Sequence, residues 1–221
     1  MPNYYGLQIS RKDKYSHRRN QKEYPRRDVT FIELDLSDLK SIRNFVVQFK
    51  STKKPIHILM NNAGIMALDT FALSKNDVEM QLATNHLGPF YLTSLLLPII
   101  KETATSSGTA RIVNLSSAAH SYTYKLGIDF ENINNAEKYS AWSAYGQSKL
   151  ANILFSNELQ KRLEESGVSN VFVNSCIPES FQPTWPVTSH CHGLLLQLLV
   201  LLPRLLLGVR LHRFIAQLQM I

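Results

Sequence analysis

The chain has 221 residues, of which 44% are hydrophobic and 19% are charged. This is enough apolar sequence for the core of one ordinary domain, and it excludes a disordered chain. Nine Gly and nine Pro exclude a collagen-like or low-complexity chain. The net charge of +7 comes mainly from the two ends, residues 1–27 and 194–221, so the middle is mildly acidic. We therefore expect no nucleic-acid partner, which would favour a basic body.

After the basic N-terminal segment, short β-rich runs alternate with longer helical patterns. Residues 29–34 predict a strand. Ser37 can cap the helix that follows, in which apolar residues recur at three- and four-residue spacing as far as Phe49. Residues 56–60 predict the next strand, and the turn residues at 61–64 end it.

The second half of the chain continues the same alternation. The expected elements are a helix over 76–97, a polar loop at 105–108, a strand over 111–115, a helix over 142–165 that stops at Gly167, and a strand over 170–176.

Short apolar strands separated by helices predict an α/β fold, with a doubly wound parallel sheet and helices on both faces. In such sheets, ligands bind beyond the carboxyl ends of the strands. Polar residues gather at these ends in this sequence. They are Asp35, residues 61–64 and the pair Ser116 and Ser117.

Tyr145 and Lys149 are four residues apart on a predicted helix, so they share a face. A tyrosine phenol ordinarily ionises near pH 10 and is a poor base at neutral pH, but a nearby ammonium favours the phenolate. A phenol whose pKa falls to roughly 7 or 8 can act as a general acid and base. The alternative is an exposed amphipathic helix on which this spacing has no chemical role.

Two further polar residues bear on this choice. Ser117 follows a predicted strand, where its hydroxyl can bind a substrate carbonyl oxygen. The alternative is a serine that caps the next turn, which is the role we expect of Ser116. Asn85 lies inside a predicted helix, where asparagine is unfavourable. Its alternative is a solvent-exposed position, although its neighbours are apolar.

Five stretches in this order and spacing resemble the short-chain dehydrogenase/reductase family, in its retinol-dehydrogenase-like and WW-domain-oxidoreductase-like branch. Each stretch is common alone, but the set is specific, and it implies a Rossmann-like fold over about residues 28–177. The stretches are Asp-Leu-Ser at 35–37, Asn-Asn-Ala-Gly at 61–64, Asn-His-Leu-Gly at 85–88, residues 111–117 and residues 145–152.

The resemblance implies an NAD(P)-dependent oxidoreductase that interconverts an alcohol and a carbonyl on a lipophilic small molecule by hydride transfer. Tyr145 would exchange a proton with the substrate. Lys149 would favour the phenolate and hold the nicotinamide ribose. Ser117 would orient the carbonyl oxygen, and Asn85 would hold a water that links Lys149 to solvent. No metal site is implied, and a homo-oligomer is the habit of the family.

The resemblance also implies cofactor-binding residues besides Tyr145 and Lys149. Asp35 and Leu36 would flank the adenine. The remaining ones, Asn62, Ala63 and Gly64, would let the backbone approach the cofactor and support the central strands.

Both ends of the chain depart from the family. The first βα unit and its Gly-rich pyrophosphate turn are missing, because Gly6 is the only glycine before Gly64. Residues 4–9 can form a strand, and Arg11 then stands where the family contacts a 2′-phosphate, which favours NADP over NAD. We divide the chain into a basic segment at 1–27, a Rossmann-like dehydrogenase core at 28–177 and a Leu-rich segment at 178–221.

The missing phosphate cradle leaves an alternative function open, namely a truncated, catalytically impaired family member that does not bind cofactor. Of residues 193–209, 12 of 17 are Leu or Val, but Pro203 and Arg204 interrupt them, so we expect a buried or interfacial helix pair rather than a membrane span. Residues 193–221 could hold the protein at a membrane surface. Only two cysteines and no apolar run in residues 1–10 favour a cytoplasmic location.

Overall fold

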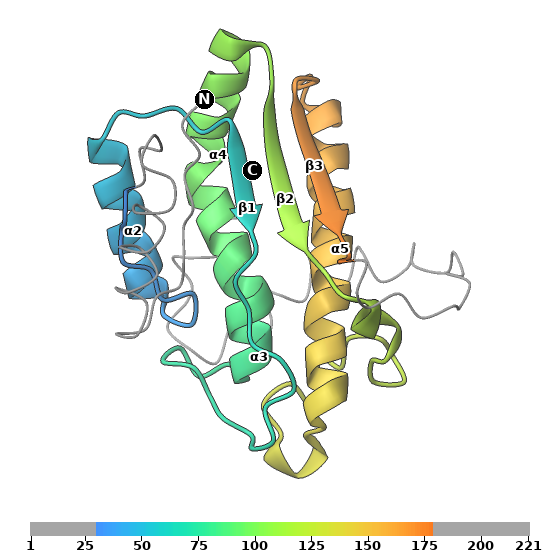
Figure 1. Cartoon of the computed structure of the whole chain (residues 1–221). Coiled ribbons are helices and arrows are strands. Elements are labelled where there is room, and N and C mark those ends of the chain that lie inside the picture. Colours follow the sequence, from blue (N-terminus) through green and yellow to red (C-terminus); the bar gives the residue numbers. More distant parts are fainter. Residues whose placement is uncertain (1–29, 179–221) are drawn as a thin grey trace.

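The computed structural model describes residues 30–178. Three strands form one parallel sheet in the order β1-β2-β3, which confirms the predicted parallel sheet (Figure 1). The strands are β1 at Ile58–Asn61, β2 at Ala110–Leu115 and β3 at Val171–Cys176, each within two residues of the predicted start.

The strand expected at residues 29–34 is wrong, because residues 30–34 have no regular secondary structure. A strand needs a neighbour for its hydrogen bonds, and the described part of the chain offers no strand beside this one. The apolar alternation still governs packing, since Leu34 and Leu36 are each 5% exposed. The segment therefore buries alternate side chains as a strand would, but among residues 30–178 it makes no strand-to-strand hydrogen bonds.

Helix α2, at Leu39–Ser51, buries the side chains that its spacing predicts, including Ile42 and Phe49. The predicted cap is wrong, because Asp38 rather than Ser37 caps this helix and accepts from the Lys40 N–H at 2.8 Å. Ser37 instead donates its N–H and its hydroxyl to Asp35 Oδ1, at 2.9 Å and 2.6 Å.

The second helical segment starts later and ends later than expected. It consists of α3 at Met80–Leu82, a π-helical turn η2 at Ala83–Leu87 and α4 at Gly88–Ser107. Residues 105–107, expected in a loop, are helical, because hydroxyls in this last turn bond to carbonyls one turn back. Gly108, at a φ of 86°, then ends the helix.

Helix α5, at Ala141–Glu165, connects β2 to β3 and confirms the predicted long helix within one residue. Two short 3₁₀ turns precede it, η3 at Ala118–Ser121 and η4 at Ala136–Lys138. Gly167, at a φ of 77°, follows its end as expected.

The two faces of the sheet differ in how they are covered. Helices α4 and α5 lie behind the sheet in Figure 1 and bury inward residues such as Ile112 and Val173. On the other face, Ile58, Met60 and Phe172 are 50%, 49% and 44% exposed. Residues 4–9, Arg11 and the Leu-rich segment lie outside the described residues. Between residues 30 and 178, no helix is long and apolar enough to cross a membrane.

Candidate active site

The predicted pair on α5 is buried and close together. The Nζ atom of Lys149 lies 5.6 Å from the centre of the Tyr145 ring and donates to the Leu115 carbonyl at 3.1 Å. Burial lowers the pKa of Lys149 to about 8, because an ammonium that loses its hydration is less stable. The alternative of an exposed amphipathic helix face is therefore wrong for this pair.

Asn85 joins the turn after β1 to helix α5. Its Oδ1 accepts from the Ile65 N–H at 2.8 Å, and its Nδ2 donates to the Ile65 carbonyl and to Ser148 Oγ, both at 2.9 Å. The side chain is 1% exposed, so the alternative of a solvent-exposed asparagine is also wrong. Gly64 lies against this junction, because a Cβ there would be 2.8 Å from Asn85 Oδ1 and 3.6 Å from Lys149 Nζ.

Of the two serines after β2, the capping role expected of Ser116 belongs to Ser117. Ser117, not Ser116, caps the next turn: its Oγ accepts from the Ala119 N–H at 3.2 Å. Accepting this bond leaves the Ser117 O–H proton available to donate. Ser116 instead donates its hydroxyl to the Lys149 carbonyl at 2.8 Å. Ser116 thus holds β2 against α5 at the lysine.

Gly146 is a residue that the sequence reasoning missed. A Cβ at this position would lie 2.6 Å from the Ala119 carbonyl and closer still to that of Tyr122. The absence of a side chain therefore lets η3, which Ser117 begins, pack its backbone onto α5 beside Tyr145. The available signal was a glycine inside a helical pattern, which costs about 1 kcal/mol relative to alanine and needs a structural reason.

A buried polar chain lies beneath the site. Asn61 donates to Asn114 Oδ1 at 2.7 Å, across the register that pairs these two residues, and to Thr93 Oγ1 at 3.0 Å. Asn114 in turn donates to Ser156 Oγ on α5 at 2.9 Å. In the stretch at 61–64, Asn61 is thus the residue that ties β1 and β2 to the helices.

The residues predicted to face the cofactor backbone lie after β1. Asn62 and Gly64 are exposed, and Ala63 is half-buried against the core. This open backbone at the carboxyl end of β1 leaves room for a ligand to approach.

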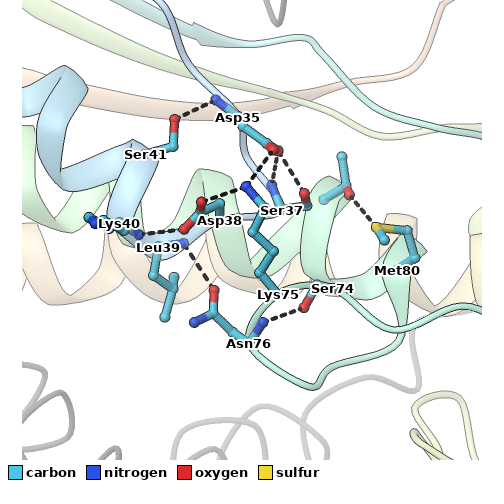
Figure 2. Close-up of polar contacts among 11 residues, drawn as sticks. Asp35, Ser37, Asp38, Leu39, Lys40, Ser41, Ser74, Lys75, Asn76 and Met80 are labelled. Carbon is cyan, nitrogen blue, oxygen red and sulfur yellow. Dashed lines mark hydrogen bonds and ion pairs between the residues drawn. The ribbon is translucent and has the colours of Figure 1, made fainter.

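The residues predicted to flank the adenine form a separate cluster, shown in Figure 2. The Asp35 carboxylate accepts from Ser37 and lies 3.9 Å from Lys75 Nζ. The side chain of Leu36 belongs to the core, and its carbonyl packs against Gly88 at the start of α4. The contacts described for Asp35 do not reach Tyr145, Lys149, Asn85 or Ser117.

The loop that contains Lys75 and Asn76 packs beside this second cluster and bonds to it. Asn76 Oδ1 accepts from the Leu39 N–H at 3.0 Å, and Lys75 pairs with Asp38 at 2.9 Å (Figure 2). A small, mostly apolar cavity of about 30 Å³ lies between the loop and α4, with room for only a few water molecules. Its apolar lining comes from Leu36, Leu39, Val78, Ala83, Leu87 and Phe90.

Comparison with known proteins identifies the family. The sequence model described as short chain dehydrogenase matches residues 7–130. The chain belongs to the short-chain dehydrogenase family. It is 51% identical over 156 residues to the short-chain dehydrogenase TIC 32 A, chloroplastic, of Brassica napus, covering 70% of this chain and 48% of that protein. Against retinol dehydrogenase 11 of Mus musculus it is 48% identical over 143 residues, covering 64% and 42%.

These relatives place the chain in the retinol-dehydrogenase-like branch of the short-chain dehydrogenases. An uncharacterised protein from Mycobacterium paratuberculosis has the same fold, with a TM-score of 0.64 and 39% identity, over 79% of this chain and 57% of that one. The predicted Rossmann-like fold is thus confirmed. The chain spans about half the length of the curated relatives it matches.

The family implies a nicotinamide dinucleotide, and the described residues of this short-chain dehydrogenase fit one end of it. Lys149 has three N–H donors, of which the Leu115 carbonyl takes one, so others are available for ribose hydroxyls. The exposed Gly64 beside it allows close approach. For the pyrophosphate, residues 30–178 contain no Gly-rich turn.

Proposed function

We propose that this chain carries the proton-transfer site of an NAD(P)-dependent oxidoreductase that interconverts an alcohol and a carbonyl. The observation that carries the proposal is the buried Lys149 ammonium, held 5.6 Å from the Tyr145 ring and beside Gly64 and Asn85. A desolvated cation next to a phenol stabilises negative charge on that phenol more strongly than it would in water. This is the requirement for a tyrosine that acts as an acid and a base.

In this proposal, Lys149 and the backbone at Gly64 would hold a nicotinamide dinucleotide, which would supply or accept a hydride. Ser117 donates its O–H to the substrate oxygen and so orients the carbonyl. During reduction, the Tyr145 hydroxyl would give its proton to that oxygen, and during oxidation the phenolate would take the proton back. Lys149 stabilises the resulting phenolate and donates to the ribose hydroxyls.

Asn85 fixes the turn after β1 against α5, and we assign to it the water predicted beside Lys149. We assign Asp35, Leu36, Asn62, Ala63 and Gly64 to the remaining contacts with the dinucleotide, and we favour NADP over NAD.

A lipophilic substrate is supported by apolar surface beside the phenol. Trp142, in the first turn of α5, is 54% exposed and packs edge-on against Tyr145, with ring centres 6.3 Å apart. Met66, which follows the Ile65 held by Asn85, is also 54% exposed. An exposed aromatic ring packed against the reacting phenol suits an apolar alcohol better than a charged one. We assign this chemistry to the core at residues 28–177, and the membrane contact and homo-oligomer stay predictions.

A family member that does not bind cofactor is the second candidate. The observation that favours it is the unpaired segment 30–34, which leaves three strands in the described sheet. The adenine would then lack the strand that positions Asp35 and Leu36. Such a chain would act by association and not by catalysis.

Titration of the purified chain with NADPH and with NADH, followed by nucleotide fluorescence, separates the two candidates. Saturable binding in the micromolar range supports the oxidoreductase, and tighter binding of NADPH supports the preference for NADP. No binding at millimolar nucleotide supports the second candidate. Tyr122→Phe, at an exposed tyrosine outside the proposed site, is the matched control and should leave nucleotide affinity unchanged.

A further inference from the structure

Asn152 occupies a junction that the proposed mechanism does not use. It lies on α5 three residues after Lys149 and is 3% exposed. Its Nδ2 donates to two backbone carbonyls at 3.0 Å, that of Asn85 in the π-helical turn and that of Leu115 at the end of β2. The Leu115 oxygen is also the acceptor for Lys149 Nζ. These two donors fill both lone pairs of the oxygen that holds the lysine.

The other end of the same carboxamide faces His86. Because Nδ2 is committed to two carbonyls, Asn152 Oδ1 must be the atom that lies 3.0 Å from His86 Nδ1. An oxygen can only accept, so His86 must carry its proton on Nδ1. The ring is 2% exposed, Nε2 has no hydrogen-bond partner, and Phe90 and Phe155 pack near it.

Burial lowers the pKa of His86 to about 4, so the ring is neutral at physiological pH. The hydrogen bond to Asn152 opposes this shift without reversing it, and among the described residues the titratable side chain that shares a partner with Asn152 is Lys149, through the Leu115 carbonyl. The neutral Nδ1–H tautomer therefore persists over the pH range in which Lys149 titrates.

We propose that Asn152 is the positioning residue of the lysine, and that His86, as its Nδ1–H tautomer, fixes the direction of the Asn152 carboxamide. By sharing the Leu115 oxygen, Asn152 holds Lys149 to a single position and keeps water out of the space between α5, β2 and η2. The catalytic meaning of this inference rests on the proposed function, but its test needs no cofactor.

The test is NMR on the cofactor-free chain, with ¹⁵N-labelled histidine and ¹³C-labelled lysine. We expect His86 at pH 7 to show protonation on Nδ1 and Lys149 to titrate near pH 8. In Asn152→Ala, water reaches the ammonium and the Leu115 oxygen is no longer shared. The pKa of Lys149 should then rise by about one unit, a tenfold change in proton affinity. Asn174→Ala, an exposed asparagine on β3, is the control and should change neither signal.

Two results would overturn the inference. One is a wild-type His86 ring protonated on Nε2, which contradicts the carboxamide orientation and is decisive even if Asn152→Ala does not fold. The other is an unchanged pKa of Lys149 in a folded Asn152→Ala variant. Failure to bind NADH or NADPH overturns the proposed function but leaves both NMR signals intact, so the two failures can be told apart.

Discussion

The two predicted parts of the cofactor site are built in different ways. Around Lys149, buried side chains connect elements that are far apart in sequence, since Asn85 reaches Ile65 and Ser148, and Ser116 reaches α5. Around Asp35, the hydrogen bonds join near neighbours, namely Ser37 and Ser41, and the ion pair is with an exposed Lys75. The proposed proton-transfer end is therefore assembled by the core, whereas the proposed adenine end follows a segment without a strand.

The largest effect should come from the proton-transfer end. With any alcohol that the wild-type chain oxidises, Tyr145→Phe should lower kcat by about 10²- to 10⁴-fold, because a positioned acid and base contributes that much to a proton transfer. Steady-state kinetics at saturating nucleotide measure this. Tyr122→Phe, at a 58% exposed tyrosine, should keep wild-type kcat. A Tyr145→Phe variant with full turnover would show that the assignment is wrong.

Lowering the pH should decrease the free energy of unfolding through His86, which is buried beneath the same end. The folded-state pKa of His86 is about 4, below the ordinary 6.5, so the unfolded chain takes up the proton first as the pH falls. The free energy of unfolding should therefore decrease by about 3 kcal/mol from neutral pH to pH 4 through this group. Urea unfolding of wild type and His86→Gln across this range isolates the contribution. Parallel pH curves for the two chains would contradict it.

At Gly146, the close approach of the η3 backbone should make alanine less favourable than glycine, the reverse of the usual order in a helix. An alanine inside a helix ordinarily stabilises by about 1 kcal/mol relative to glycine. Gly146→Ala should instead destabilise by about 1–3 kcal/mol, because its Cβ overlaps the carbonyls of Ala119 and Tyr122. Asn157→Ala, at an exposed position of the same helix, is the control and should be neutral or slightly stabilising. A stabilised Gly146→Ala would mean that η3 does not pack onto α5 there.

The adenine end should give the smallest effect. Asn76→Ala removes the acceptor for the Leu39 N–H at the start of α2 and should cost about 1 kcal/mol of unfolding free energy. The titration of Lys149 should stay at its wild-type pKa, because the two ends share no described contact. Chemical denaturation and lysine NMR of one sample check both statements. A changed pKa of Lys149 in this variant would show that the two ends are coupled.

Periodicity and turn residues were enough to predict most of the fold. The apolar spacing places α2 and α5 nearly as observed, and the glycine at 167 follows the end of α5. The strand predicted at 29–34 was wrong, because a local apolar alternation does not supply the neighbouring strand that hydrogen bonding requires. The predicted loop at 105–108 was wrong for residues 105–107, because serine and threonine side chains there bond to the backbone of α4.

The sequence was enough to propose candidate site residues but not to predict their contacts. Tyr145 and Lys149 follow from helix geometry, and Asn85 and Ser117 from their positions after or within predicted elements. The partners of Asn152, His86 and Gly146 lie up to 67 positions away in sequence, so no local pattern contains them. Which of two adjacent serines caps a turn likewise depends on α5, which supplies the acceptor for Ser116.

The most direct test of the account is the affinity of the chain for NADH as a function of pH. If the Lys149 ammonium holds the nicotinamide ribose, affinity measured by nucleotide fluorescence should fall as the pH rises through about 8, where this group loses its proton. Lys149→Met should bind weakly and without that dependence. An affinity that is constant from about pH 6 to about pH 10, or no saturable binding at any pH, would contradict the account.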